Sequence, residues 1–354
     1  MPCCFQLPAC IPRQLLITYY VKEIKSLYRT YRPKTFDQVI GQDHIVKILK
    51  NQIAANKVSH AYLFCGSRGT GKTTVAKIFA RTVSAASPDE QKKASFLVHG
   101  DLDIFEIDAA SNNSVQDVRD IIEKVKYPPV NSKYKVYIID EVHMFSGSAF
   151  NAFLKTLEDT PSHIIFILCT TEPHKILPTV QSRCLRFDFR PACEKDIQKV
   201  LTTVLKKENV AATDDAIKLI TAAACGSYRD ALSFAETVIS YSGTQITADD
   251  AAQVLGTVAP ETLTLLLNQI KEKKINSITK TCDTIFQKGI NINLLIKNFL
   301  EIIKKEFITG PAGQPQVGHI FKIFSELELS IKNSLDPKTH FENTCLLACV
   351  QKEQ

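Results

Sequence analysis

The first half of the chain alternates short apolar runs with segments of helical periodicity. Five apolar runs predict strands, at 62–65, 104–108, 135–141, 164–169 and 184–189. Apolar positions at helical spacing predict one helix before the first strand, at 43–56, and three helices between strands, at 72–79, 114–126 and 146–159. Strands that are apolar on both faces and alternate with helices are typical of a parallel sheet covered on both sides. The pattern therefore predicts an α/β fold whose chemistry gathers at the carboxyl ends of the strands.

From Pro191 onward the pattern becomes all-helical. Helical periodicity covers 194–209, 214–225, 227–241 and 247–255, and resumes after Gly256 at 261–271, 277–287, 292–307, 317–332 and 338–350. A chain of 354 residues exceeds one ordinary compact domain. We therefore expect two or three domains, with the change from the alternating pattern to the all-helical pattern at Pro191. Residues 1–27 hold three early prolines and lack the pattern of a secretory signal. We expect a poorly ordered extension there, and a start assigned too far upstream is the alternative.

A glycine-rich turn joins the first predicted strand to its helix. Its residues fit the phosphate-loop pattern G-x-x-x-x-G-K-[ST] and are Gly66, Ser67, Arg68, Gly69, Thr70, Gly71, Lys72, Thr73 and Thr74. Glycines let the backbone N–H groups turn toward a phosphate, and the helix N-terminus adds partial positive charge. Lys72 can reach the β- and γ-phosphate oxygens, and the Thr73 hydroxyl can hold Mg²⁺. A chance strand–turn–helix is the alternative.

Polar residues stand directly after two other strands. Asp140 is placed as the second Mg²⁺ ligand, and Glu141 is placed to polarise the water that attacks the γ-phosphate. The alternative is a pair of acids that caps a strand and faces solvent. Thr170 and Thr171 end the fourth strand, where a hydroxyl could orient the same water, although threonine also simply favours strands.

Composition adds limits to this interpretation. The chain is 45% hydrophobic with a formal charge of +6, which is compatible with nucleic acid or nucleotide partners but does not argue for them alone. Its 11 cysteines form no C-x-x-C pair and no His/Cys cluster with zinc spacing, so we expect reduced thiols in a cytoplasmic protein. No run of about 18 apolar residues exists, so we expect no transmembrane helix.

The order of the motifs carries a family resemblance. The segments are 31–36, 40–42, 66–74, 106–114, 139–144, 153–158, 170–173, 181–184 and 226–233. They resemble the bacterial DNA polymerase III gamma/tau subunit, the ATPase of the sliding-clamp loader and a member of the AAA+ superfamily. The resemblance covers residues 28–255 with specific motifs and continues as helical pattern to the end. It implies a nucleotide-binding domain at 28–188, a helical lid at 189–255 and an oligomerisation collar at 256–354.

The same resemblance implies roles for individual residues. Thr170 or Thr171 would be the first sensor of ATP. The segments 31–33 and 39–41, the second of which includes Val39 and Ile40, would lie near the adenine. Two arginines that could otherwise be surface residues gain roles as well. Arg183 would act in trans on the ATP of a neighbouring subunit, and Arg229 would be the lid sensor. The implied partners are other clamp-loader subunits, the sliding clamp and primer-template DNA, within the DNA polymerase holoenzyme.

The sequence departs from the family pattern in two places. The interval Arg81–Asp103 contains no cysteine where gamma/tau proteins carry a four-cysteine zinc module, so we expect no zinc site. The sequence ends at Gln354, without the long tau tail, so we expect a short gamma-like or second-copy role. Two alternatives stay open: another AAA+ DNA motor, such as a branch-migration helicase, and a clamp-loader scaffold that binds nucleotide without hydrolysing it.

Overall fold

The computed structural model describes residues 26–85, 102–258, 260–287, 290, 292–309, 315–331 and 336–349. The expected N-terminal extension lies almost entirely outside these residues. So does most of the interval 81–103, on which the expectation of no zinc rests.

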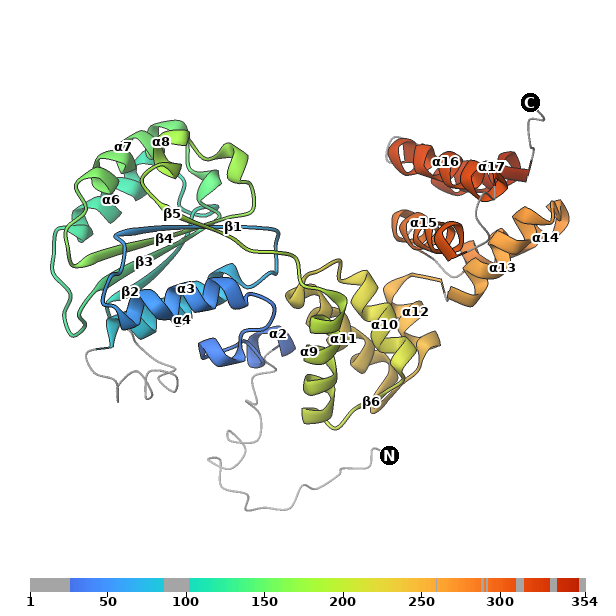
Figure 1. Cartoon of the computed structure of the whole chain (residues 1–354), viewed down its shortest axis with the longest axis horizontal. Helices are drawn as coiled ribbons and strands as arrows, with labels where there is room; N and C mark the ends of the chain where they lie inside the picture. The colour runs from blue at the N-terminus through green and yellow to red at the C-terminus, as the bar shows by residue number, and fades with distance from the viewer. Residues whose placement is uncertain are drawn as a thin grey trace, which may run out of the picture.

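Five parallel strands form the central sheet (Figure 1). They are β1 (Ala61–Cys65), β2 (Ile104–Asp108), β3 (Lys135–Asp140), β4 (Ile164–Thr170) and β5 (Leu185–Asp188), in the order β2-β3-β4-β1-β5. The inner strands β1 and β4 are buried along their whole length, and the edge strands β2 and β5 are partly exposed. The predicted parallel α/β fold is confirmed, and all five strands lie within a residue or two of their expected bounds.

Helices cover both faces of this sheet. On one face lie α3 (Asp43–Ala54) and α4 (Lys72–Ser84), whose apolar side chains pack against β1, β3 and β4. The other face is covered by α6 (Val115–Val125), α7 (Gly147–Glu158) and the short α8 (Pro178–Gln181) (Figure 1). Short elements fill the connections: α2 (Leu27–Thr30) and the 3-10 turns η1 (Phe36–Gln38), η2 (Val142–Met144) and η3 (Pro173–Lys175).

The next helical region has a core of its own. It contains α9 (Glu194–Lys207), α10 (Asp214–Ala223), α11 (Tyr228–Ser242) and α12 (Ala248–Leu255). Two short parallel strands, β6 (Ala211–Ala212) and β7 (Gln245–Ile246), pair between the helices. The all-helical prediction from Pro191 onward was wrong at these strands, because two residues are too short to produce a period. Gly256 ends α12 with a left-handed backbone, and the domain bounds at 189 and 256 stay predictions.

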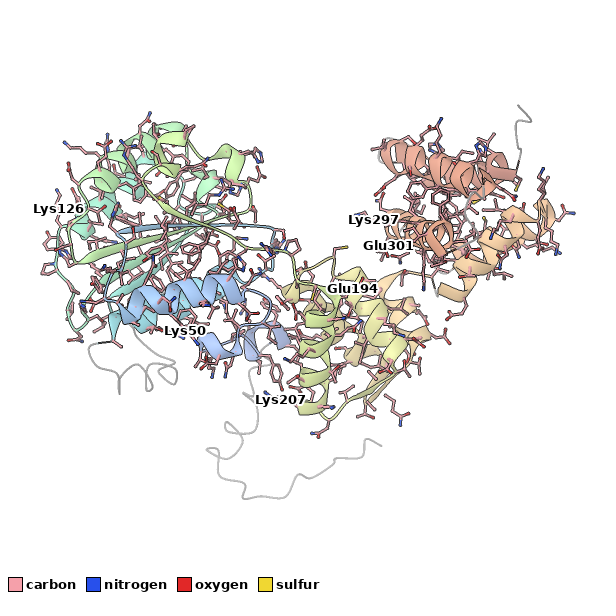
Figure 2. The ribbon with its side chains drawn as sticks, viewed as in Figure 1. Lys50, Lys126, Glu194, Lys207, Lys297 and Glu301 are labelled. Atoms are coloured by element: carbon pink, nitrogen blue, oxygen red, sulfur yellow. The ribbon has the colours of Figure 1, made fainter. Side chains whose placement is uncertain are left out.

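The C-terminal region consists of α13 (Pro260–Lys271), α14 (Ile275–Gln287), α15 (Ile292–Thr309), α16 (Pro315–Ser330) and α17 (Pro337–Cys349). Three buried aromatic rings stand at the centre of its core. The ring of Phe299 lies 4.8 Å from that of Phe324, and Phe324 lies 5.8 Å from Phe341, both in edge-to-face geometry. Charged side chains such as Lys50 and Lys207 project from the outer surfaces of their helices (Figure 2).

The cysteines of the described residues are all free thiols. Cys65 and Cys169 are buried in the sheet, where burial raises the pKa of both thiols. Cys225 is instead exposed just after α10, with a positive φ of 46°. No helix among the described residues has the length and apolarity that crossing a bilayer requires.

Candidate functional site

The glycine-rich turn runs from the carboxyl end of β1 to the first turn of α4. The Gly66 N–H donates to the Thr170 carbonyl oxygen at 3.2 Å, which ties the start of the turn to β4. Gly69 has a φ of +76°, and a Cβ there would lie 1.9 Å from the Ser227 Oγ. A side chain at Gly69 is therefore excluded by the start of α11 as well as by the backbone. Ser67 and Arg68 are exposed at the tip of the turn, and Thr70 is buried.

Lys72 is the first residue of α4 and is only 5% exposed. Its Nζ donates to the carbonyl oxygens of Gly66 and Ser67, both at 2.9 Å. Burial lowers the pKa of this ammonium, and the nearby carboxylates of Glu141 and Asp140 act in the opposite direction. A cation at the N-terminus of a helix forms a site suited to an anion.

The two acids that end β3 meet this loop. The Thr73 hydroxyl donates to the Asp140 Oδ2 at 2.8 Å, across 67 residues of sequence. A hydroxyl and a carboxylate at this separation are oxygen ligands of the kind that Mg²⁺ prefers, so the residues present fit that ion. Glu141 leaves the strand with a left-handed backbone, at a φ of 49°. The described residues contain no cluster of three or more His, Cys, Asp or Glu side chains suited to a metal.

The two threonines after β4 have different partners. The Thr171 hydroxyl donates to the Glu141 Oε2 at 2.9 Å, and the Thr171 N–H lies 3.3 Å from the same oxygen. Thr170 is completely buried, and its Oγ1 accepts from the Glu172 N–H at 3.0 Å. Of the two, Thr171 alone contacts Glu141. The sensor role of either stays a prediction.

His143 lies beside Thr170 and Glu141, although the sequence analysis gave it no role. Its Nδ1 is 3.1 Å from the Thr170 Oγ1 and 3.5 Å from the Glu141 Oε2. In the sequence, the signal for His143 is a titratable side chain two positions after Glu141. His143 therefore belongs to the network that holds Glu141.

The start of α11 lies directly on the glycine-rich turn. The Tyr228 N–H donates to the Gly69 carbonyl oxygen at 3.1 Å, and a Cβ on Gly69 would lie 3.3 Å from the Arg229 Cβ. The guanidinium of Arg229 stacks over the Tyr28 ring, 4.9 Å from its centroid. Arg229 is thus brought to the loop from about 160 residues away in sequence. Its role as the lid sensor stays a prediction.

The predicted adenine-side residues lie where the two regions join. The Ile40 carbonyl oxygen accepts from the Tyr228 hydroxyl at 3.0 Å. The side chain of Val39 packs against the core between α3, α4 and the sheet. The neighbouring Gly41 also faces Tyr228, because a Cβ on Gly41 would lie 2.7 Å from that hydroxyl. Val39 and Ile40 are therefore at the junction, and their contact with adenine stays a prediction.

Arg183 lies apart from the other site residues. It precedes β5, so it stands near the amino edge of a sheet whose carboxyl edge carries the glycine-rich turn. The four residues of β5 lie between Arg183 and the carboxyl edge, about 13 Å at ~3.3 Å per residue. The Arg183 Nη2 donates to the Glu158 Oε1 at 2.6 Å, and Nη1 donates to the Thr179 carbonyl oxygen at 2.7 Å. Arg183 is therefore held at the surface and away from the loop of its own chain.

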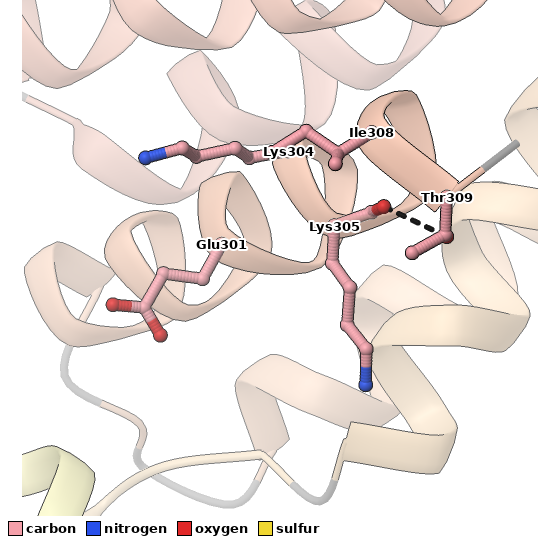
Figure 3. Close-up of a pocket in the computed structure, with 5 residues that line it drawn as sticks. All are labelled: Glu301, Lys304, Lys305, Ile308 and Thr309. Carbon is pink, nitrogen blue, oxygen red and sulfur yellow. Dashed lines mark hydrogen bonds between the residues drawn. The ribbon is translucent and has the colours of Figure 1, made fainter.

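A surface hollow of about 350 Å³ lies elsewhere, along α15 (Figure 3). Its lining residues are Glu301, Lys304, Lys305, Ile308 and Thr309. All five come from one helix, and none is a predicted site residue. The hollow is therefore separate from the residues gathered around the glycine-rich turn.

Comparison with known proteins agrees with this arrangement. The family model described as "DNA polymerase III, delta subunit" matches residues 41–192. The model described as "DNA polymerase III clamp loader subunit, ATPase lid domain" matches residues 196–244. Among solved structures, the RuvB Holliday junction branch migration motor of Thermotoga maritima has a TM-score of 0.50 at 18% identity, over 78% of this chain and 92% of that chain. At this identity, the likeness concerns the fold alone.

Curated relatives extend the match beyond single domains. DNA polymerase III subunit tau of Bacillus subtilis is 44% identical over 283 residues, which is 78% of this chain and 50% of the relative. DNA polymerase III subunit gamma of Buchnera aphidicola subsp. Baizongia pistaciae is 35% identical over 284 residues, which is 78% of this chain and 77% of that subunit. The chain spans half or less of the length of the tau relatives. It belongs to the DNA polymerase III gamma/tau clamp-loader subunit family.

Proposed function

We propose that this chain is an ATP-hydrolysing subunit of a clamp loader, which places a sliding clamp on primed DNA within the DNA polymerase III holoenzyme. One observation carries the proposal. The glycine-rich turn, the acids of β3 and the arginine of α11 meet at one edge of the sheet, although they come from three distant parts of the sequence. A site divided between a sheet domain and a lid can bind nucleotide and respond to its hydrolysis.

In this proposal, residues 66–74 bind the triphosphate of ATP. The backbone amides of the turn and the Lys72 ammonium contact the phosphates. Thr73 and Asp140 hold Mg²⁺, whose contribution is to neutralise charge on the phosphate oxygens. Val39 and Ile40 lie beside the adenine, and Arg229 contacts the nucleotide from the lid.

Glu141 is the general base for hydrolysis. Its carboxylate accepts a proton from the water whose oxygen attacks the γ-phosphorus, and ADP leaves with the electrons of the broken bond. Thr171 holds this carboxylate by the hydrogen bond at 2.9 Å. A fixed carboxylate costs less reorganisation at the moment of reaction than a mobile one.

Arg183 completes the site of a neighbouring subunit. Support comes from its place at the amino edge of the sheet, because an arginine there is far from the phosphate loop of its own chain. An arginine supplied in trans stabilises charge in the transition state and makes hydrolysis depend on assembly. The other loader subunits, the clamp and primer-template DNA are the partners of this proposal.

The test is Glu141→Gln in the assembled complex, with Glu123→Gln on the exposed face of α6 as the matched control. We expect Glu141→Gln to bind a fluorescent ATP analogue like the unchanged chain and to lose clamp- and primer-stimulated ATP turnover. Glu123→Gln should retain both. Unchanged turnover in Glu141→Gln would remove Glu141 from the mechanism.

The two alternatives are separated by the Glu141→Gln complex and by an unwinding assay. A nucleotide-binding scaffold would show no loss of complex turnover in Glu141→Gln, because other subunits would hydrolyse all the ATP. A branch-migration motor would unwind branched DNA without a clamp. Within the described residues beyond 256, every assigned element is a helix, which supports a collar over the DNA-binding winged helix expected of such a motor.

A further inference from the structure

We propose that Gln42 is a positioning residue for ATP turnover, which acts by fixing the hinge of the lid at residues 190–191. The inference rests on the proposed function, because the reaction that Gln42 assists is the hydrolysis of ATP bound at residues 66–74. The sequence analysis gave Gln42 no role of its own.

The side chain of Gln42 binds the backbone of a residue 148 positions away in the sequence. Gln42 is the N-cap of α3 and is only 1% exposed, yet its side chain does not cap this helix. Instead, its Nε2 donates to the Arg190 carbonyl oxygen at 2.7 Å, and its Oε1 accepts from the Arg190 N–H at 3.3 Å. One buried amide thus pairs with both backbone groups of one residue, as a neighbouring strand would.

Arg190 lies between the last contact of the sheet and the first contact of the lid. On the sheet side, the Phe189 N–H donates to the Cys65 carbonyl oxygen at 2.7 Å, and the Phe189 side chain is buried in the core. On the lid side, the Ala192 N–H donates to the Gly226 carbonyl oxygen at 2.9 Å, shortly before α11. Figure 1 shows the chain crossing from β5 to α9 at this point. The lid can therefore turn at the two residues between these contacts, 190 and 191.

Pro191 limits the freedom of this hinge. Its ring fixes its own φ, and a residue that precedes proline is restricted to extended backbone. The ring also lies close to the lid, because a Cβ on Gly226 would lie 2.8 Å from the Pro191 Cβ. The freedom that remains is mainly that of Arg190, and Gln42 binds both of its backbone groups. Two hydrogen bonds at this residue are therefore well placed to hold the lid.

The segment that carries Gln42 also contacts the lid directly. The Ile40 carbonyl oxygen accepts from the Tyr228 hydroxyl of α11 at 3.0 Å. A Cβ on Gly41 would lie 2.9 Å from the Asp196 Oδ2 of α9. Three consecutive residues thus contact α11, α9 and the hinge, and in the proposed function the adenine lies beside the same segment. A lid that is fixed before ATP arrives loses less freedom on binding, which raises the affinity.

The experiment compares Gln42→Met with the matched control Gln52→Met in the full chain. Methionine keeps the length of the side chain and removes both hydrogen bonds to Arg190. Gln52 lies in α3 as well, but its partner is the Tyr62 hydroxyl at 3.1 Å, within the sheet domain. We expect Gln42→Met to bind a fluorescent ATP analogue about 3- to 10-fold more weakly, the range of one net hydrogen bond. Gln52→Met should bind it like the unchanged chain, and an equal loss in this control would overturn the proposal.

Amide hydrogen exchange locates the effect along the chain. The N–H groups of Phe189, Arg190 and Ala192 all have partners, and mass spectrometry with fragmentation resolves them singly. Gln42→Met should exchange faster at Arg190 and Ala192 and at an unchanged rate at Phe189. Its Tm without nucleotide should stay the same, because Arg190 is exposed and water can replace the lost bonds. Unchanged exchange at Arg190, or a lower Tm with faster exchange at all three, would make Gln42 a packing residue and overturn the proposal.

Turnover in the assembled complex separates positioning from loss of structure. For Gln42→Met we expect the KM for ATP to rise by about 3- to 10-fold with kcat retained, because saturating ATP fixes the lid. A fall in kcat at constant KM would contradict the proposal.

A second variant reaches the hinge without touching Gln42. Pro191→Gly frees the backbone at an exposed position, so it should also weaken ATP binding. Unchanged affinity in Pro191→Gly would place the hinge elsewhere and overturn the proposal. Failure of the unchanged chain to bind ATP would instead overturn the proposed function, and the exchange at Arg190 would still test the hinge.

Discussion

Gly69 is the point at which the lid touches the glycine-rich turn, and its replacement by alanine tests that contact. The new Cβ would lie 1.9 Å from the Ser227 Oγ, about 1.5 Å inside ordinary van der Waals contact, and 3.0 Å from the Ser227 Cβ. Ser227 cannot yield freely, because its Oγ caps α11 by accepting from the Asp230 N–H at 3.2 Å. Loss of that cap costs about 1 kcal/mol, and a left-handed alanine costs a further 1–2 kcal/mol.

Gly69→Ala should therefore lower the free energy of unfolding by roughly 2–3 kcal/mol, or move the lid off the loop and weaken ATP binding. Gly243→Ala is the matched control, since Gly243 has a φ of +73° and nothing lies within 4 Å of its added Cβ. Urea unfolding and ATP titration measure the two effects. In the double variant Gly69→Ala/Ser227→Gly, which removes the clashing hydroxyl at little capping cost, affinity should recover in part. If the double variant binds ATP no better than Gly69→Ala, the reasoning about the contact is refuted.

Three further changes test other parts of the site. Thr171→Val removes the hydroxyl that holds Glu141, so ATP turnover in the complex should fall about 5-fold while ATP affinity stays constant; equal loss of both would point to a binding role. Arg183→Gln should leave the unfolding of the isolated chain unchanged but reduce turnover in the complex by roughly 10³-fold, and full turnover would exclude action in trans. The hydrogen bond to Glu208 raises the pKa of Tyr31 to about 12, so the stability that it adds is present below pH 10 and is lost as pH rises toward 12. Thermal unfolding of Tyr31→Phe should lack that part of the pH dependence, and an identical profile would contradict the assignment.

The sheet and its loop could be predicted because their signals are local. An apolar run such as 164–169 and the glycine pattern at 66–74 are complete within a few residues of sequence. The separate tasks of Thr170 and Thr171 could not be predicted, because they depend on a strand register that places one beside His143 and the other beside Glu141. The strands β6 and β7 were missed for a similar reason, since each consists of two residues and exists only through its partner.

Contacts between the lid and the nucleotide-binding domain also could not be predicted from local sequence patterns, because they join residues far apart in the chain. Gly69 is part of the glycine-rich loop pattern, and its lack of a side chain also leaves room for Ser227. The sequence pattern predicts the first of these roles and not the second. The same holds for Tyr228, whose backbone donates to the loop while its hydroxyl donates to Ile40. One turn of α11 thus contacts both the expected phosphate side and the expected adenine side of the nucleotide. A ligand bound between them would gain affinity from every contact that fixes the lid, and its hydrolysis would release the lid by weakening the same contacts. Under the proposed function, the coupling between ATP and lid position would therefore lie at residues 226–229.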